Sequence, residues 1–403
     1  MVISKELINY SLKNLWQSRG RSFMTILSIF VGITTIFIFI SFGWGLYDYT
    51  ESFQSSSSVD KVMIQAKGMG APGLDDTFKL TDDDLEAIEK VAGVFEASGS
   101  YFRAAQVEKG TEQKYIFFIS YDPKKPIMME LSNIDIEEGR WLRNGEAGRV
   151  IAGYNYLIPG RIFPDQYALG DMIKIDGKKM RIVGFLEEVG NPADDSQIYI
   201  TNDYMEELYA DDNLSYGMLI ARVDVKNIDE IIAKIEKNLR KERGLEEGQE
   251  DFYVQSFQDL IESFAIALNV IIAFVILIAL ISVVVSAVNT ANTMVTSVLE
   301  RIKEIGIMKS VGAQNSEIFK VFLFESAFLG FVAGVLGVAL GWLVSYIAGV
   351  ILDNFGWGFL SPHFSASLFL GCIAFATLTG AISGAWPAWS ASKIRPVDAL
   401  RYE

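Results

Sequence analysis

The chain has 403 residues, half of them hydrophobic, and carries a net charge of −15 at neutral pH. Because one soluble domain rarely combines this length with this hydrophobic content, we expect a membrane protein with one or two soluble domains. The acidic balance argues against a nucleic-acid-binding protein, which presents a basic face. A single cysteine and a single histidine exclude, within one chain, a disulfide framework, a thiolate metal cluster and a multi-histidine metal site.

The N-terminal part of the chain combines a basic segment with a long apolar run. Residues 1–21 hold four basic side chains among spaced apolar residues, which predicts an amphipathic helix on the cytoplasmic membrane surface. Residues 22–47 contain no charged side chain and exceed the length of about 20 residues that crosses a bilayer. Since the apolar core of a signal peptide spans only about 7–15 residues, we predict an uncleaved first span.

Residues 48–259 form a polar, strongly acidic region without a run long enough to cross a membrane. Thr81 followed by three aspartates predicts a helix start, and Asp176-Gly177 has the composition of a hairpin turn. The predicted strands are 61–66, 101–107, 115–120, 149–152, 172–175, 179–185, 197–200 and 252–255, and the predicted helices are 81–91 and 228–240. We predict an α+β domain in which βαβ-like halves flank a β-rich insert at residues 131–222.

Motifs that indicate catalytic or binding chemistry are weak in this region. The segment Gly68–Gly73 matches G-x-G-x-x-G, but its proline and the following Asp75 and Asp76 fit a loop better than a phosphate site. No G-x-x-x-x-G-K-[ST] phosphate loop occurs, so we expect no ATPase on this chain. Three acid pairs fit solvated turns, because their spacing matches no calcium loop; these are Glu187/Glu188, Asp194/Asp195 and Asp211/Asp212.

Three further apolar runs follow the acidic region. Residues 260–298 are too long for the ~30 Å bilayer core and predict a second span that continues outward as a stalk. Residues 318–350 and 365–387 are the predicted third and fourth spans, with the loop 351–364 between them and the tail 388–403 behind. Glycines in these two spans favour close packing within the chain over a seam between chains; they are Gly330, Gly334, Gly337, Gly341, Gly380 and Gly384.

The distribution of Lys and Arg predicts the orientation of the four spans. Basic residues are frequent in residues 1–21, in the segment 300–320 and in the tail, and they are absent from residues 352–364. Both termini and the segment after the second span are therefore predicted to be cytoplasmic. The acidic domain and the loop between the third and fourth spans are predicted to lie outside.

The polar segment 299–317, between the second and third spans, predicts a short helix at the membrane surface. Four residues from Ile302 to Lys309 recur at helical spacing, and Gly312 is the expected stop of this helix. Asn315 or Ser316 is the expected cap of the helix that follows.

One acidic side chain, Glu325, falls within the first two turns of the third span, where an unpaired charge is costly. Two interpretations are open. In the first, Glu325 pairs with a basic residue of the segment 299–317, either Arg301 or Lys309. In the second, its side chain reaches back to the cytoplasmic surface.

Several segments of the sequence resemble one family of transport proteins. The run Glu300-Arg301, Lys303-Glu304-Ile305-Gly306-Ile307, Lys309 and Val311-Gly312-Ala313 resembles the coupling-helix segment of the MacB/FtsX-like permeases, which belong to the type VII ABC transporters. The ending Arg395-Pro396-Val397-Asp398-Ala399-Leu400 resembles the terminal signature of that family. Glu138–Trp141, Ala168–Asp171 and Arg181–Gly184 resemble its extracytoplasmic domain more loosely.

This resemblance implies a multi-pass subunit of the cell membrane that holds no catalytic residue. Its implied partners are a separate cytoplasmic ABC ATPase, which binds ATP and Mg²⁺, a second permease subunit, membrane lipids, and an outer adaptor or substrate protein. The implied function is to transmit ATP-driven movement to the outer domain for export or release of a lipoprotein, peptide or drug-like substrate. The implied ATPase-coupling residues are Glu300, Arg301, Lys303, Glu304, Ile305, Gly306, Lys309 and Gly312.

Three alternatives remain open at the level of sequence. Within the family, the chain is an FtsX-like regulator of cell-wall hydrolases, although such members tend to have a smaller outer domain. From another class, it is a membrane-anchored sensor, against which the short tail after residue 387 argues. Finally, it is a membrane-anchored enzyme with an outer active site, against which the shortage of His and Cys argues.

Overall fold

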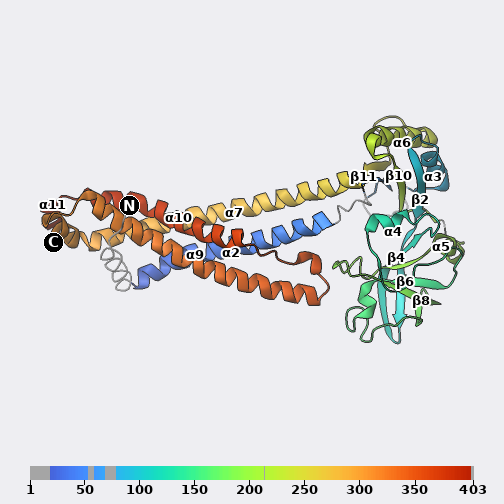
Figure 1. The fold of residues 1–403 in the computed structure, drawn as a ribbon, viewed down its shortest axis with the longest axis horizontal. Helices are drawn as coiled ribbons and strands as arrows, with labels where there is room; N and C mark the ends of the chain where they lie inside the picture. Colours follow the sequence, from blue (N-terminus) through green and yellow to red (C-terminus); the bar gives the residue numbers. More distant parts are fainter. Residues whose placement is uncertain (1–18, 53–58, 69–78, 213, 401–403) are drawn as a thin grey trace. The chain divides into compact units, whose positions relative to one another are not determined.

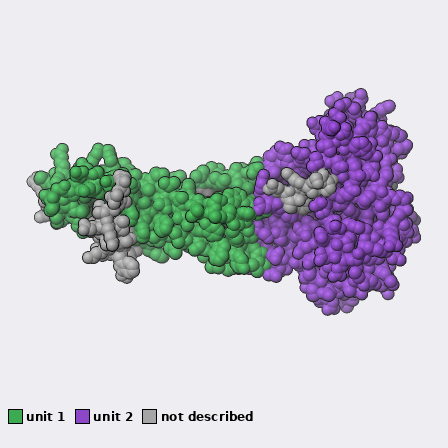
Figure 2. All heavy atoms as spheres, in the orientation of Figure 1, with its two compact units in different colours: residues 1–45, 268–350, 362–403 green, residues 46–267, 351–361 purple. Residues whose placement is uncertain are grey.

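The computed structural model describes residues 19–52, 59–68, 79–212 and 214–400. Residues 1–18 of the predicted amphipathic segment and residues 69–73 of the glycine motif therefore lie outside the described residues. The chain divides into two compact units, which Figure 2 colours separately. The helical unit comprises residues 1–45, 268–350 and 362–403, and the α/β unit comprises residues 46–267 and 351–361.

Within the described residues, four helices are long and apolar enough to cross a membrane, judged by length and composition. Each of the four predicted spans overlaps one of them. The exposed side chains of these helices are largely aliphatic or aromatic, for example Phe274 and Ile278, which suits contact with lipid. The helices, shown in Figure 1, are α2 (Arg19–Ser52), α7 (Phe257–Glu300), α9 (Asn315–Asn354) and α10 (Ala366–Ser392).

The helix α10 extends further than the sequence predicts. The sequence predicts that the fourth span ends at Pro387, but α10 continues to Ser392 with this proline inside it. A proline removes one helical hydrogen bond, and spanning helices tolerate the loss where neighbouring helices hold the backbone. Ala388 and Ala391 are fully buried in a hydrophobic cluster with residues of the other helices, so packing keeps the last turns of α10 helical.

Glycines on α9 and α10 allow these helices to approach their neighbours closely. A Cβ atom on Gly330 would lie 2.5 Å from the carbonyl oxygen of Ala376 in α10. A Cβ atom on Gly380 would lie 2.5 Å from the carbonyl oxygen of Ser326 in α9. The same crowding within the chain surrounds the other glycines of the predicted set, which are Gly334, Gly337, Gly341 and Gly384.

The α/β unit contains two sheets, and the first of them has four antiparallel strands in the order β11-β1-β10-β2. Its strands are β1 (Lys61–Ala66), β2 (Val94–Ser100), β10 (Met218–Val223) and β11 (Phe252–Ser256). Between β1 and β2 runs α3 (Asp82–Glu89), and between β10 and β11 runs α6 (Ile228–Arg243). The resulting β-α-β-β-α-β sequence is a split βαβ arrangement, so the two predicted βαβ-like halves build one sheet.

The second sheet is inserted between β2 and β10 and has seven strands in the order β5-β8-β6-β9-β4-β3-β7. Two of its pairings, β4–β9 and β6–β8, are parallel. The inserted segment also contains two short helices that the sequence does not predict, α4 (Ile127–Ser132), which contacts β2 and β10 of the first sheet, and α5 (Asn202–Leu208), which contacts β4 and β9. The strands are β3 (Phe102–Lys109), β4 (Glu112–Tyr121), β5 (Ile136–Gly139), β6 (Arg149–Ala152), β7 (Met172–Ile175), β8 (Lys178–Leu186) and β9 (Ile198–Thr201).

The predicted bounds of the β-rich insert, residues 131–222, are wrong at both ends. The second sheet already includes the β3–β4 hairpin, which begins at Phe102, whereas β10 belongs to the first sheet. The alternation of apolar residues shows which face of a strand is buried and does not show which sheet the strand joins. The first and last residues of the insert can therefore be assigned only from the strand pairing in the tertiary structure.

Local signals set the caps and turns of the α/β unit. Thr81 caps α3, and its backbone N–H donates to the Asp84 carboxylate at 2.8 Å, which confirms the predicted helix start. Asp176 and Gly177 have positive φ angles of 44° and 78°, as the predicted hairpin turn between β7 and β8 requires. One hydrophobic cluster extends from the first sheet into the second and gives both a common core.

Candidate functional site

The polar segment between α7 and α9 folds into a short helix, α8 (Ile302–Ser310). It ends before Gly312, whose φ of +107° is a conformation that glycine adopts without strain. α9 then begins at Asn315, and the backbone N–H of Gln314 donates to the Glu317 carboxylate at 2.9 Å. The cap of α9 is therefore Gln314. The predicted caps, Asn315 and Ser316, lie one and two positions further along the chain.

One face of α8 is docked on the ends of three spanning helices. Ile305 is fully buried in a cluster with side chains of α7, α9 and α10, among them Phe322 and Ala388. Gly306 is buried beside it, and the Ser310 hydroxyl donates to the Gly306 carbonyl oxygen at 2.8 Å. A short helix packed in this way moves together with the helices beneath it.

Arg301 lies directly before α8 and forms an ion pair with Glu325 of α9. The guanidinium lies 3.1 Å from the Glu325 carboxylate and 3.2 Å from the Glu304 carboxylate, and it stands over the ring of Phe322. Because the Glu325 side chain is only 3% exposed, the interpretation in which it reaches back to the surface is wrong. A buried charge is stable only when it is paired, so this contact fastens the start of α8 to α9.

Lys309, near the other end of α8, contacts the last residue of α10 and the turn that follows it, and not Glu325. Its ammonium donates to the carbonyl oxygens of Ser392 at 2.6 Å and Ile394 at 2.8 Å. The last carbonyls of a helix lack partners within that helix and attract a cation. Burial lowers the pKa of the Lys309 ammonium. The end of α8 is thereby fastened to α10.

The opposite face of α8 is exposed and carries both charged and apolar side chains. Lys303 is exposed, Ile307 is 56% exposed and Val311 is 85% exposed. A small helix, α11 (Pro396–Leu400), packs beside α8 and adds the exposed side chain of Val397. Apolar side chains exposed together on a small surface helix are typical of a protein contact surface.

The structure thus divides the predicted site residues between the two faces and the ends of α8. Glu300 ends α7, Lys303 and Glu304 are exposed, and Gly312 lies in the turn after α8. The anchoring residues are Arg301, Ile305, Gly306 and Lys309. Ile307 and Val311 form an exposed apolar pair that the predicted set does not include. Their spacing of four residues, on a different face from Ile305, is the signal in the sequence that indicates this pair.

The segment around α8 has the features of a protein contact surface and not those of a metal site. Within the ranges that the structure describes, no group of three or more His, Cys, Asp or Glu side chains could hold a metal ion. His363 has a packing role, since its backbone N–H donates to the Ser41 carbonyl oxygen at 2.8 Å and its ring lies 6.3 Å from that of Trp44.

The sequence matches two described families, the MacB-like periplasmic core domain over residues 22–238 and the FtsX-like permease C-terminal domain over residues 276–396. An uncharacterized ABC transporter permease of Methanocaldococcus jannaschii is 32% identical over 400 residues, which cover 99% of this chain and 98% of that protein. The ABC transporter permease YknZ of Bacillus subtilis is 26% identical over 415 residues, with 99% of each chain covered. The macrolide export ATP-binding/permease protein MacB of Bdellovibrio bacteriovorus is 26% identical, and the match covers 99% of this chain but 62% of that protein.

Two solved structures are similar to part of the chain. The extracellular domain of the transporter YknZ matches with a TM-score of 0.38 and 15% identity, over 48% of this chain and 99% of that domain. The periplasmic region of MacB from Actinobacillus actinomycetemcomitans matches with a TM-score of 0.41 and 11% identity, over 53% of this chain and 98% of that region.

Proposed function

This chain belongs to the MacB/FtsX-like family of ABC transporter permeases, and from that premise we propose that it couples a separate cytoplasmic ABC ATPase to a large domain outside the membrane. Two relatives that are named only as permeases are covered over 98% and 99% of their length. These relatives match this chain over almost their whole length and are named as permeases alone, which supports an ATPase in a partner subunit. ATP and Mg²⁺ bind in that partner, and this chain transmits the movement.

The observation that carries the proposal is the division of α8 into two faces. Its inner face is fixed to α7, α9 and α10 through Ile305, Arg301 and Lys309. Its outer face exposes Ile307 and Val311 to a partner. An ATPase seated on the outer face therefore displaces three spanning helices together when it closes on ATP, because packed helices shift as rigid bodies.

The proposed orientation puts α8 and both termini in the cytoplasm and the α/β unit outside. Its support is the clustering of Lys and Arg around α8 and in the tail, and their absence from residues 352–364. α7 runs without interruption from Phe257 to Glu300. At 1.5 Å per residue it is roughly twice as long as the ~30 Å bilayer core, so it can carry movement from α8 beyond the membrane.

Relatives of this chain are named for macrolide export and for pyoverdine export. We propose that this subunit likewise serves export or release of a lipoprotein, peptide or drug-like compound. It works with a second permease subunit, identical or related, within surrounding lipids and with an outer adaptor or substrate protein. The FtsX-like match over residues 276–396 keeps the regulation of a cell-wall hydrolase as a second candidate, which uses the same coupling surface.

The coupling surface is tested by placing a charge on it. Ile307→Glu and Val311→Glu each put a carboxylate in the centre of the proposed ATPase contact without disturbing the buried face of α8. We expect co-purification with the ATPase and permease-dependent stimulation of ATP hydrolysis to fall about tenfold or more, as for a central interface residue.

The matched control for this experiment is Val225→Glu, which changes an apolar side chain of the α/β unit that is 47% exposed. It should leave membrane insertion, co-purification and ATP hydrolysis unchanged. Full ATPase stimulation by both α8 variants, at normal expression, would show that the motor docks elsewhere.

A further inference from the structure

The α/β unit has a hollow of about 690 Å³ beside α4. Side chains at or just after the ends of β4, β5 and β8 complete its wall, and they include Tyr121, Trp141 and Glu187. The volume is within the range of about 300–1,000 Å³ that is usual for small-ligand sites in proteins. Nothing in the coupling function described above uses this hollow.

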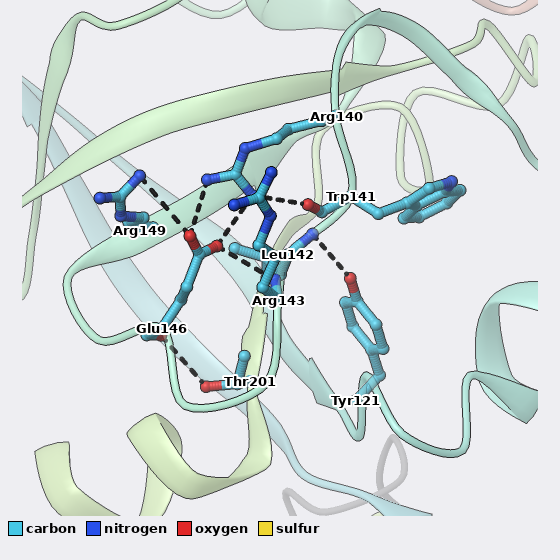
Figure 3. A network of polar contacts seen from close by, with 8 residues as sticks. All are labelled: Tyr121, Arg140, Trp141, Leu142, Arg143, Glu146, Arg149 and Thr201. Carbon is cyan, nitrogen blue, oxygen red and sulfur yellow. Dashed lines mark hydrogen bonds and ion pairs between the residues drawn. The ribbon is translucent and has the colours of Figure 1, made fainter.

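Two aromatic side chains of the wall are held in a fixed arrangement. The rings of Tyr121 and Trp141 meet edge to face, with 6.3 Å between centroids and an interplanar angle of 82°. The Tyr121 hydroxyl accepts a hydrogen bond from the backbone N–H of Leu142 at 3.2 Å, as Figure 3 shows. Leu142 and Met129 also line the hollow and are almost fully buried.

The loop that carries Trp141 is held by a clamp between Arg140 and Glu146, drawn in Figure 3. The guanidinium donates to both carboxylate oxygens, at 2.9 and 2.7 Å, and also to the carbonyl oxygen of Trp141 at 2.9 Å. These hydrogen bonds lower the pKa of Glu146 to about 2, so the clamp is ionised at neutral pH. A wall fixed in this way loses little conformational entropy when a ligand binds.

The polar part of the lining is negatively charged. It contains three carboxylates, Glu130, Asp135 and Glu187, and no Lys or Arg. Glu130 is already paired with Arg222 and Lys61. Asp135 and Glu187 are exposed, and no described cation lies within ion-pair distance of either.

We propose that this hollow binds an amphipathic cation, meaning an apolar or aromatic body that bears one ammonium or guanidinium group. The apolar body fits against Trp141 and Leu142, and the cation lies between the aromatic rings and the carboxylates of Asp135 and Glu187. Both aromatic faces and carboxylates attract a positive charge and repel a carboxylate ligand. The site goes beyond the coupling function and can be tested without any ATPase.

The probe is a tripeptide with blocked termini, acetyl-Leu-Phe-Arg-amide, and its counterpart is acetyl-Leu-Phe-Glu-amide. Binding to the full chain in nanodiscs of zwitterionic lipid is measured by calorimetry, with empty nanodiscs as the blank. We expect the arginine peptide to bind about tenfold or more tightly than the glutamate peptide, and its affinity to fall with added salt.

Two changes separate the charged and apolar parts of the site. The double variant Asp135→Asn/Glu187→Gln should weaken the arginine peptide about tenfold and remove the preference over the glutamate peptide. Trp141→Leu should weaken both peptides. The control Glu207→Gln, which also removes one carboxylate but lies on α5, should leave both affinities unchanged.

Equal affinity for the two peptides, no binding of either, or an arginine-peptide affinity that survives the double variant would each overturn the assignment. Because the measurement contains no ATPase, these outcomes leave the coupling function of α8 untouched. A failure of the α8 variants to uncouple the ATPase would, in turn, say nothing against the ligand site.

Discussion

Arg301 and Glu325 are two charges that the fold buries together at the junction of α8 and α9. Their side chains are 13% and 3% exposed, and 3.1 Å separates the nearest nitrogen and oxygen. Desolvation costs several kcal/mol per ion, and the contact between the two charges offsets that cost. The pair therefore fixes where α8 begins and how it is held on the membrane-spanning helices.

Removing one member of this pair should cost more than removing both. We expect Glu325→Leu to lower the free energy of unfolding by on the order of 3 kcal/mol, because the largely buried Arg301 charge then loses its buried carboxylate partner and keeps the exposed carboxylate of Glu304. In Arg301→Met/Glu325→Leu part of that loss should be regained. Thermal unfolding of the four proteins of this cycle in detergent gives the coupling free energy. Strictly additive losses would show that the two residues do not interact.

At the scale of whole elements, α9 is the helix on which the others meet. Its Gly330 faces α10, and its Gly337 and Gly341 face α2, with Cβ positions that would lie 2.5–3.0 Å from atoms of those helices. The inner face of α8 packs on the start of α9 through Phe322. Through these close contacts, α9 joins the inner face of α8 to both α2 and α10.

The close approach of α9 and α10 can be tested with a single methyl group. Gly330→Ala would place its Cβ 2.5 Å from the Ala376 carbonyl oxygen, so we expect a destabilisation of about 1–3 kcal/mol, measured as a lower Tm in detergent. The matched control is Gly371→Ala on α10, whose Cβ meets no atom within 4 Å and should be neutral or slightly stabilising. Equal Tm values for the two variants would contradict the tight α9–α10 seam.

At the scale of the whole molecule, the proposed coupling function requires α8 and the α/β unit to lie on opposite sides of the membrane. The single cysteine, Cys372, is buried, so a Cys372→Ala background accepts one new cysteine at a time. In intact cells we expect a membrane-impermeant maleimide to label Glu207→Cys and not Lys303→Cys. After permeabilisation both should react. Labelling of both positions in intact cells would put α8 out of reach of a cytoplasmic ATPase.

Local patterns determined many elements of this protein in advance. The strands β1, β6 and β7 have the predicted bounds, and the start of α3 and the turn at Asp176-Gly177 follow from residues beside them in the sequence. The four spanning helices follow from long apolar runs, because about 20 apolar residues cross the bilayer and a helix pairs its backbone polar groups within the segment. Local motifs around α8 also indicated that the chain belongs to the permease family.

Long-range contacts decided what the sequence left open or gave wrongly. Strand pairing decides which of the two sheets β3, β4 and β10 belong to. The packing of other helices against Ala388 and Ala391 keeps α10 helical beyond Pro387. The partner of Glu325 and the exposure of Ile307 likewise depended on which helices lie next to α8. A hydrophobic or charged pattern states that a side chain will be buried or paired, but the free energy of that contact comes from residues far away in the chain, and only the tertiary structure names them.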